Sequence, residues 1–250
     1  MAGVTRLEDV VYWVCPFFPA IWRFNATTHE RLTNIVVKDL IRPYDVVACE
    51  RTSQLYIADY EQCVWRVSSG GADIKRWLPK SPNDIFRPRS LSVTSTRLLV
   101  TSYDIHQLIL FDSNGDELRR VQLRRYVYPL HAMESPTGTF IVSLINNKLK
   151  QGQVYLAEVN TGGKVLRQFS GSCVPSLGWT HVAVDSHGNI FVADRDNRLI
   201  LDAHLFLRRV IIDDHQLHYK PPERLCYREQ SGQLLVALYG EVGVFDVLCG

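Results

Sequence analysis

The 250-residue sequence lacks any long hydrophobic run and has almost no net charge. Its longest apolar segment, residues 10–22, contains two prolines and falls short of the roughly 18 unbroken apolar residues of a transmembrane helix. Twenty-eight Lys and Arg against 26 Asp and Glu leave a formal charge of +2, which argues against a binder whose whole surface is basic. Any nucleic-acid site would therefore be a local patch, and we expect no membrane association.

The sequence also lacks a secretory signal and any paired-cysteine motif. The residues before the apolar segment include Glu8 and Asp9, have no basic excess, and are followed by no small-residue cleavage site. The six cysteines show no CxxC pair and no metal-ligand spacing, which favours buried free thiols. Asn25 begins a formal glycosylation triplet, which would matter only in a secreted protein. We therefore expect a cytoplasmic protein.

Several common signatures are missing as well. No segment keeps a helical period over three turns with caps at both ends, and no GxSxG elbow, P-loop or dinucleotide fingerprint occurs. The sequence thus favours an all-β protein and gives no support to the enzyme classes that these motifs mark.

What the sequence does contain is an internal repeat. Six short apolar runs end at positions 14, 58, 101, 143, 193 and 237, with steps of 44, 43, 42, 50 and 44. A second series of alternating segments follows in the same frame, and each of its members is followed by a small polar residue suited to a turn. A third series precedes each run from the second unit on, and a more variable strand closes each unit. Four antiparallel strands per repeat is typical of a β-propeller.

We predict an all-β fold in which residues 1–250 form a single domain, a six-bladed β-propeller of four-stranded antiparallel blades. The terminal blades are expected to be incomplete, since the first unit shows its second to fourth strands and the last unit ends at its third. Residues 4–7 are the segment available to complete an end blade. Trp22 and Trp65 occupy one place in consecutive third strands and are expected between blades.

Two units carry a family resemblance. Residues 179–200 run through an apolar strand, a Gly-containing turn, the strand Phe191-Val192-Ala193-Asp194 and then Asn197-Arg198, an order that resembles the NHL repeat. Residues 43–47 with 55–59 are a second good match. The other units are degenerate, and the first is equally similar to YWTD propeller blades. The resemblance spans nearly the whole chain and implies a propeller that binds proteins or RNA, or, in one enzymatic branch, a peptide-amidating lyase.

The predicted site follows from the propeller. Connections from a fourth strand to the next first strand, and from a second to a third, gather on one face, where ligands usually bind. The Arg, Tyr, Trp and His side chains there suit protein contacts and also single-stranded RNA. We predict no catalytic residue. The predicted ligand-binding residues are Tyr60, Arg87, Arg89, Tyr103, Trp179, His181, Arg195, Arg224 and Tyr239.

A basic run, residues 118–126, holds four arginines within seven positions. We predict an exposed outermost strand there, since charged side chains on a sheet edge oppose aggregation. An electrostatic patch for RNA or an acidic partner is the alternative.

The enzymatic alternative needs metal ligands. Lyase-type propellers place histidines directly after the leading proline of several blades. His131 and His181 come one place later, and two imidazoles without a third ligand make a poor zinc site. We therefore expect no metal and no cofactor, and we predict a non-catalytic platform for a protein partner. RNA binding is the second hypothesis, and a metal-dependent lyase or hydrolase is the third. The sequence gives no indication of the oligomeric state.

Overall fold

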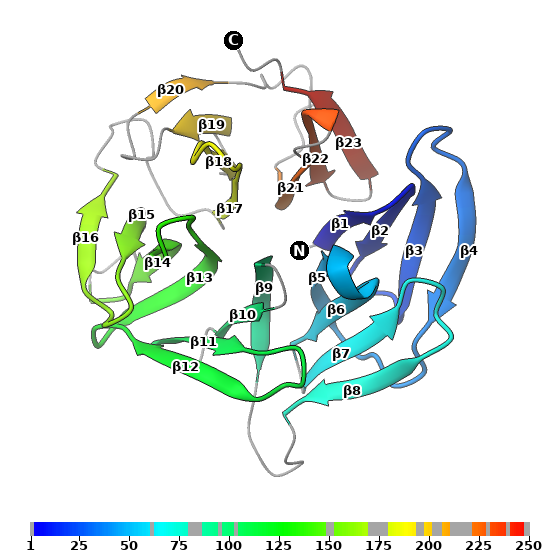
Figure 1. Ribbon diagram of the computed structural model, residues 1–250, viewed down its shortest axis with the longest axis horizontal. Coiled ribbons are helices and arrows are strands. Elements are labelled where there is room, and N and C mark those ends of the chain that lie inside the picture. The colour runs from blue at the N-terminus through cyan, green and yellow to red at the C-terminus, as the bar shows by residue number, and fades with distance from the viewer. Residues whose placement is uncertain are drawn as a thin grey trace.

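The computed structural model is a ring of antiparallel β-sheets around a central channel (Figure 1). The 3-10 helix η1 spans only Glu50–Thr52, and within the described part of the chain no helix is long and apolar enough to cross a bilayer. The structure describes residues 3–60, 63–79, 87–94, 97–102, 105–148, 153–169, 180–193, 198–201, 207–210, 222–228, 231–238 and 241–247.

The first three sheets each contain four consecutive strands, with the first of the four next to the channel and the last outermost. These strands are β1 (Gly3–Leu7), β2 (Val10–Val14), β3 (Ala20–Asn25) and β4 (Arg31–Val36); β5 (Pro43–Cys49), β6 (Gln54–Asp59), β7 (Cys63–Ser68) and β8 (Ile74–Leu78); and β9 (Pro88–Thr94), β10 (Arg97–Ser102), β11 (Gln107–Phe111) and β12 (Glu117–Gln122).

The remaining sheets continue the pattern, except that the last has three described strands. They contain β13 (Val127–Glu134), β14 (Phe140–Asn146), β15 (Gln153–Val159) and β16 (Val165–Gln168); β17 (His181–Val184), β18 (Ile190–Ala193), β19 (Arg198–Leu201) and β20 (Leu207–Val210); and β21 (Arg224–Arg228), β22 (Gln233–Leu238) and β23 (Glu241–Asp246).

The all-β prediction is confirmed, but the prediction of six four-stranded blades needs correction. Five sheets are four-stranded blades, and the last sheet stops at its third described strand. The reason lies in β1, which pairs with β2 from Gly3 opposite Val14 to Leu7 opposite Val10. Residues 4–7 therefore complete the first blade, as one of the predicted options, and are not available as a fourth strand for the last.

The core lies between the sheets, because the two faces of each second strand pack against different neighbours. In β6, Leu55 and Ile57 pack in the cluster shared with the first sheet, whereas Tyr56 and Ala58 pack in the cluster shared with the third. Strands buried on both faces lose the apolar-polar alternation and become continuous apolar runs. This burial explains the repeated runs of the sequence.

The two tryptophans predicted between blades lie there. Trp65 is buried in the cluster between the first and second sheets. Trp22 is half-buried beside the cluster between the sixth and first sheets, with the guanidinium of Arg31 4.2 Å from its ring centroid. The prediction of an exposed edge strand in the basic run is also confirmed, since β12 is outermost and mostly exposed.

The described cysteines agree with the predicted free thiols. Cys15, Cys49, Cys63 and Cys226 form no disulfide. Burial, the largest cause, and then the carboxylate of Asp59 raise the pKa of the Cys63 thiol to about 12.

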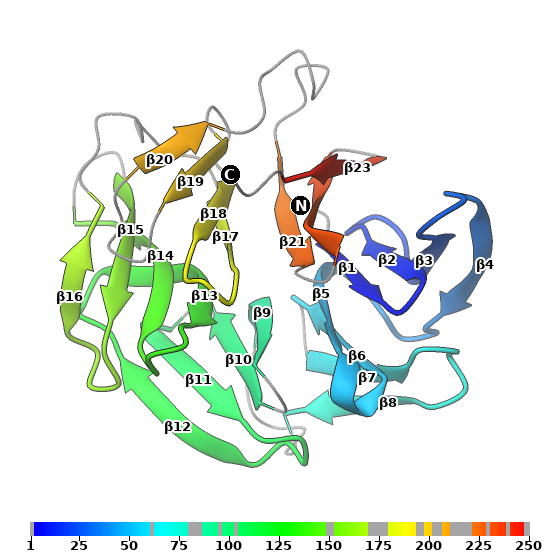
Figure 2. The same cartoon turned by 45° about the horizontal axis from the view of Figure 1, so that its top comes forward.

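The ring closes by side-chain packing between the sixth and first sheets. Val4, Val11 and Trp13 of the first sheet meet Leu235 and Ala237 of β22. No described strand of one of these sheets pairs with a strand of the other. Figure 2, tilted by 45°, shows β21 next to β1 at this junction.

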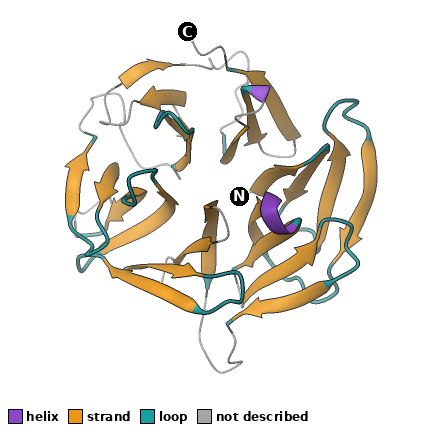
Figure 3. Ribbon diagram, in the orientation of Figure 1, coloured by secondary structure: helices purple, strands orange, loops and turns teal. Residues whose placement is uncertain are grey.

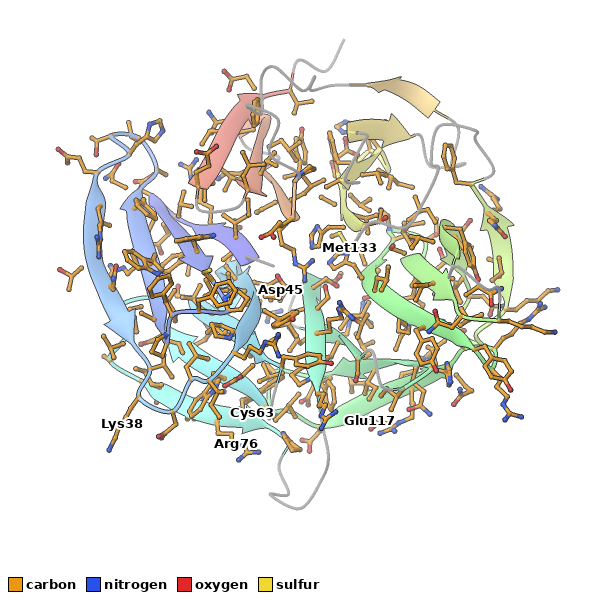
Figure 4. The ribbon with its side chains drawn as sticks, turned by 180° about the vertical axis from the view of Figure 1, so that it is seen from behind. Lys38, Asp45, Cys63, Arg76, Glu117 and Met133 are labelled. Atoms are coloured by element: carbon orange, nitrogen blue, oxygen red, sulfur yellow. The ribbon has the colours of Figure 1, made fainter. Side chains whose placement is uncertain are left out.

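Each sheet is a meander, so its connections alternate between the two faces of the ring. Hairpins joining first to second and third to fourth strands lie on one face, and η1, drawn in front of β5 in Figures 1 and 3, belongs to it. We call the opposite face, seen in Figure 4, the crossover face. Its described parts include the connections from β2 to β3, from β4 to β5 and from β12 to β13.

If packing closes the ring, a truncated side chain at the junction should destabilise the protein. Leu235 is 1% exposed at the junction of the sixth and first sheets. We expect Leu235→Ala to lower the free energy of unfolding by about 2–5 kcal/mol, since it removes buried methyl groups and leaves a cavity. Val244→Ala, at a side chain 38% exposed in the same sheet, should change it by about 0.5 kcal/mol or less. Equal effects in urea unfolding would show that the junction does not stabilise the ring.

Candidate functional site

One position of each innermost strand is equivalent through the strand register. It is the residue opposite the last member of each apolar run of the repeat. We call these six residues the channel ring: Gly3, Asp45, Ser90, His131, His181 and Arg224.

Asp45 is the centre of the hydrogen bonding in the channel ring. Its Oδ2 accepts from the Ser90 hydroxyl at 3.0 Å and from the Leu91 N–H at 2.9 Å, and its Oδ1 accepts from the Val46 N–H at 3.0 Å. The Nε of Arg224 lies 3.1 Å from Oδ1, and both side chains are almost fully buried. Three hydrogen-bond donors and one guanidinium thus surround the two oxygens, which uses most of the acceptor capacity of a carboxylate.

The ion pair between Arg224 and Asp45 spans the first sheet, because β21 and β5 are separated in the ring by β1. The first sheet contributes Gly3 at this level. A Cβ built on Gly3 would lie 2.6 Å from the Val46 nitrogen and 2.7 Å from the Asp45 Cα. A side chain there would collide with β5, so glycine keeps the first sheet close to the second at the level of the ion pair.

The two histidines link the next sheets in the same way. The Nδ1 of His131 accepts from the Val182 N–H at 3.4 Å, and the Nδ1 of His181 accepts from the Leu225 N–H at 3.2 Å. Their ring centroids are 3.6 Å apart, and both side chains are buried. An Nδ1 that accepts places the proton of a neutral imidazole on Nε2.

Burial lowers the pKa of both imidazoles well below 6.5. For His131 the next cause is the positive charge of Arg224. For His181 the next causes are the charge interaction with His131 and then that with Arg224. A hydrogen bond with the backbone of Leu91 opposes the shift at His131. Both histidines are therefore neutral at pH 7.

Asp45, His131 and His181 would be a metal-ligand set by residue type, since one ligand atom of each lies within 4.8 Å of the others. Their surroundings do not fit a resident divalent cation. The guanidinium of Arg224 holds the carboxylate and would repel the ion, and both Nδ1 atoms are engaged by backbone N–H groups. The cluster suits a structural role in joining sheets.

The channel itself holds a cavity of about 690 Å³. Innermost strands line it with apolar side chains, and in Figure 4 Asp45 and Met133 border it. The lining also carries charged side chains, namely Arg6, Arg51 and Arg228 together with Glu50. Burial and then the charge of Arg228 lower the pKa of Arg6.

On the crossover face, buried Asp59 fixes the connection between β4 and β5. Its two oxygens accept from the backbone N–H groups of Ile41 and Arg42, each at 2.9 Å. The Tyr60 N–H in turn donates to the Arg42 carbonyl at 3.0 Å. Asp59 is the last residue of β6, in the segment 55–59 that resembles an NHL repeat. The aspartate of the Ala-Asp pair therefore positions the connection between β4 and β5.

Exposed apolar and aromatic side chains lie in this connection and in the connection between β2 and β3. Ile41 is 60% exposed and Phe17, in the connection between β2 and β3, is 72% exposed. Tyr44 and Tyr60 stack with ring centroids 4.9 Å apart, and the guanidinium carbon of Arg42 lies 5.4 and 5.7 Å from them. We call this group, together with Phe18, the docking patch.

Phe18 belongs to a rigid turn. Its N–H donates to the Cys15 carbonyl at 3.1 Å, and its ring meets Trp22 edge-on at 5.9 Å. Prolines 16 and 19 flank the pair of phenylalanines. The turn therefore presents Phe17 to solvent from a backbone with little freedom.

The predicted ligand-binding residues divide into three groups. Arg89, His181 and Arg224 are buried beside or within the channel ring, not exposed on the crossover face. Tyr60 is half-buried in the docking patch, and Arg87 is exposed just before β9. Tyr103, Trp179, Arg195 and Tyr239 lie outside the described residues.

Sequence reasoning missed Asp45, Gly3 and the exposed Phe17 and Ile41. The signal for the channel ring was present, because the position after Tyr44, Arg89, Leu130, Thr180 and Glu223 is polar in all five units. For Phe17 the signal was an apolar segment interrupted by prolines.

The chain is similar in fold to solved β-propeller structures. No protein-family model matches it, and no curated protein does, so the NHL resemblance stays a prediction. A gluconolactonase from Xanthomonas campestris is 12% identical with a TM-score of 0.72, over 95% of this chain and 82% of that one. A chain of a nidogen/laminin complex is 15% identical with a TM-score of 0.66, over 85% of this chain and 80% of that one. A streptogramin B lyase is 10% identical with a TM-score of 0.65, over 97% of this chain and 91% of that one. At these identities the likeness establishes the propeller fold alone.

Because His131 and His181 are buried and neutral, we expect the stability of the fold to fall at acid pH. Because the folded chain keeps both neutral while the unfolded chain protonates them below pH 6.5, stability is full above that pH and falls as the pH drops. We expect a loss of about 1.4 kcal/mol per pH unit for each histidine below this value.

The measurement is urea unfolding at several pH values for the wild type, His181→Gln and His29→Asn, whose histidine is exposed. His181→Gln should flatten the dependence and His29→Asn should not. Parallel curves for all three proteins would contradict the assignment.

Proposed function

We propose that this chain, as a single propeller domain, is a non-catalytic platform that binds an apolar segment of a protein partner through the docking patch. The observation that carries the proposal is the exposure of Phe17 and Ile41 on a backbone that hydrogen bonds and prolines hold fixed. Exposed large apolar side chains on one face of a soluble protein mark candidate interaction sites, and Phe17 and Ile41 lie in two connections of the crossover face.

The backbone around the patch reduces the cost of binding. Asp59 holds the amides of Ile41 and Arg42, and Trp22 supports Phe18. Side chains that are already positioned lose little conformational entropy on binding. The patch therefore combines apolar area with preorganisation.

The composition of the patch also fits a protein partner. Aromatic and arginine side chains are enriched at the centres of protein interfaces and in their hot spots. The stack of Arg42 on Tyr44 and Tyr60 places these residue types next to exposed Ile41, which precedes Arg42 in the chain. One structural neighbour was solved as a nidogen/laminin complex, which is consistent with a propeller used for protein contacts.

The non-catalytic part of the proposal rests on the channel ring. Two structural neighbours are a lyase and a lactonase, so the fold is compatible with catalysis. In this chain Asp45 is already held by Ser90, Arg224 and backbone N–H groups. His131 and His181 accept from backbone N–H groups, which favours the crossover face as the candidate for function.

RNA binding is the alternative, and one observation favours it. Exposed Arg42 and Arg125 in crossover connections lie over tyrosine rings, and Arg87 is also exposed, just before β9. Such a mixture can hold phosphates and stack bases. Contacts to phosphates would make affinity fall steeply with salt.

We also propose a cytoplasmic location, on the same sequence grounds as before. In that compartment thiols stay reduced and the Asn25 triplet is not modified.

The test is selection of binding peptides from a random display library, followed by affinity measurements. We expect the double variant Phe17→Ser, Ile41→Ser to weaken the best peptide at least about tenfold, the size of a single hot spot. Leu166→Ser, which removes a side chain 46% exposed on β16, should leave the affinity unchanged.

A randomised single-stranded RNA pool, measured at low and physiological salt, completes the experiment. Unchanged peptide affinity in the double variant would overturn the assignment to the docking patch. Salt-sensitive RNA binding together with no selectable peptide would replace it with the alternative.

A further inference from the structure

A second cavity, of about 530 Å³, lies between the third and fourth sheets. The connection between β12 and β13 forms one side, and strands β14 to β16 form the other. Its polar lining comes from Arg124, Arg125, Asn146, Lys148, Tyr155 and Gln168. We call it the basic groove.

The described lining of the basic groove gathers positive charge. Three cationic side chains line it, and none of the described residues of its lining is acidic. The arginine run provides a contrast, because Arg120 is held by Glu117 with contacts of 2.9 and 2.6 Å on the exposed strand β12. Like charges brought together repel each other, and a bound anion would relieve that repulsion.

The backbone fixes the positions of these cations. The Val127 N–H donates to the Arg124 carbonyl at 3.1 Å, which closes a turn in which Tyr126 has a φ of 69°. The Asn147 N–H donates to the Tyr126 carbonyl at 3.0 Å and ties the second connection to the first. Lys148 follows Asn147 directly, so this hydrogen bond brings its backbone next to the turn that carries the two arginines, and all three side chains line the same cavity.

Side chains inside the basic groove add neutral donors. Burial, the larger cause, raises the pKa of the Tyr155 hydroxyl, and the nearby positive charge of Arg124 opposes the shift. The hydroxyl is therefore protonated at neutral pH and able to donate. The Arg125 guanidinium lies 4.9 Å from the Tyr126 ring centroid, which limits its freedom.

We propose that the basic groove binds a small phosphate ester, with the phosphate held by Arg124, Arg125 and Lys148. Arginine forks pair with phosphate oxygens in a bidentate way, and lysine adds a point charge. A volume of about 530 Å³ falls within the range of small-molecule sites, so the groove has room for a sugar or base beside the phosphate. This site does not depend on the docking patch, which lies on the first two sheets.

The test is calorimetric titration of the full chain with adenosine monophosphate, ribose 5-phosphate, inorganic phosphate and adenosine. We expect both phosphate esters to bind, adenosine not to bind, and affinity to fall from low to physiological salt. Arg124→Gln and Lys148→Gln should each raise the Kd about tenfold or more, since each removes a charged contact.

Arg119→Gln is the matched control, because it removes an exposed arginine of the same run that does not line the basic groove. It should leave the Kd unchanged, and thermal unfolding should show that all three variants remain folded. Absence of binding by the wild type, equal binding of adenosine, or an equal loss in Arg119→Gln would overturn the proposal. Binding of single-stranded RNA without binding of either ester would overturn it in favour of a nucleic-acid strand.

Discussion

The buried ion pair between Arg224 and Asp45 is the contact on which closure of this ring depends most. It joins the sixth sheet to the second across the first, and Gly3 keeps the first sheet close to β5 at that level. No described strand of the first sheet pairs with the sixth, so side-chain contacts must hold that junction. A buried charge without its partner is strongly unfavourable, which makes the pair sensitive to the loss of either member.

Use of the channel ring for closure has a consequence for function. Asp45 is surrounded by donors, and His131 and His181 are neutral and engaged by backbone N–H groups. Groups that could bind a ligand or metal in another propeller here connect neighbouring sheets. Exposed apolar and basic side chains instead gather on the crossover connections, as the docking patch on the first two sheets and the basic groove between the third and fourth. The rigid frame therefore supports two surfaces of different chemistry.

The sequence predicted the strands well because both faces of each second strand are buried, which produces apolar runs at a regular period. It predicted less about the site, because burial at the channel depends on contacts between sheets that the repeat does not reveal. Arg89 and Arg224 were expected on an exposed face for this reason, and they are buried. Which end blade residues 4–7 complete was also left open, since the pairing partner of β1 cannot be read from the period. Phe17 and Ile41 stand out only once the backbone around them is known.

A double-mutant cycle on Asp45 and Arg224 tests the closure most directly. Urea unfolding of Asp45→Asn, Arg224→Met and the double variant would give the coupling energy between the two side chains. We predict that Arg224→Met alone lowers stability by about 3–5 kcal/mol, because it leaves a buried carboxylate unpaired, and that Asp45→Asn restores part of the loss. The expected coupling is about 1–3 kcal/mol. Additive effects, within about 0.5 kcal/mol, would contradict the role of this ion pair in closing the ring.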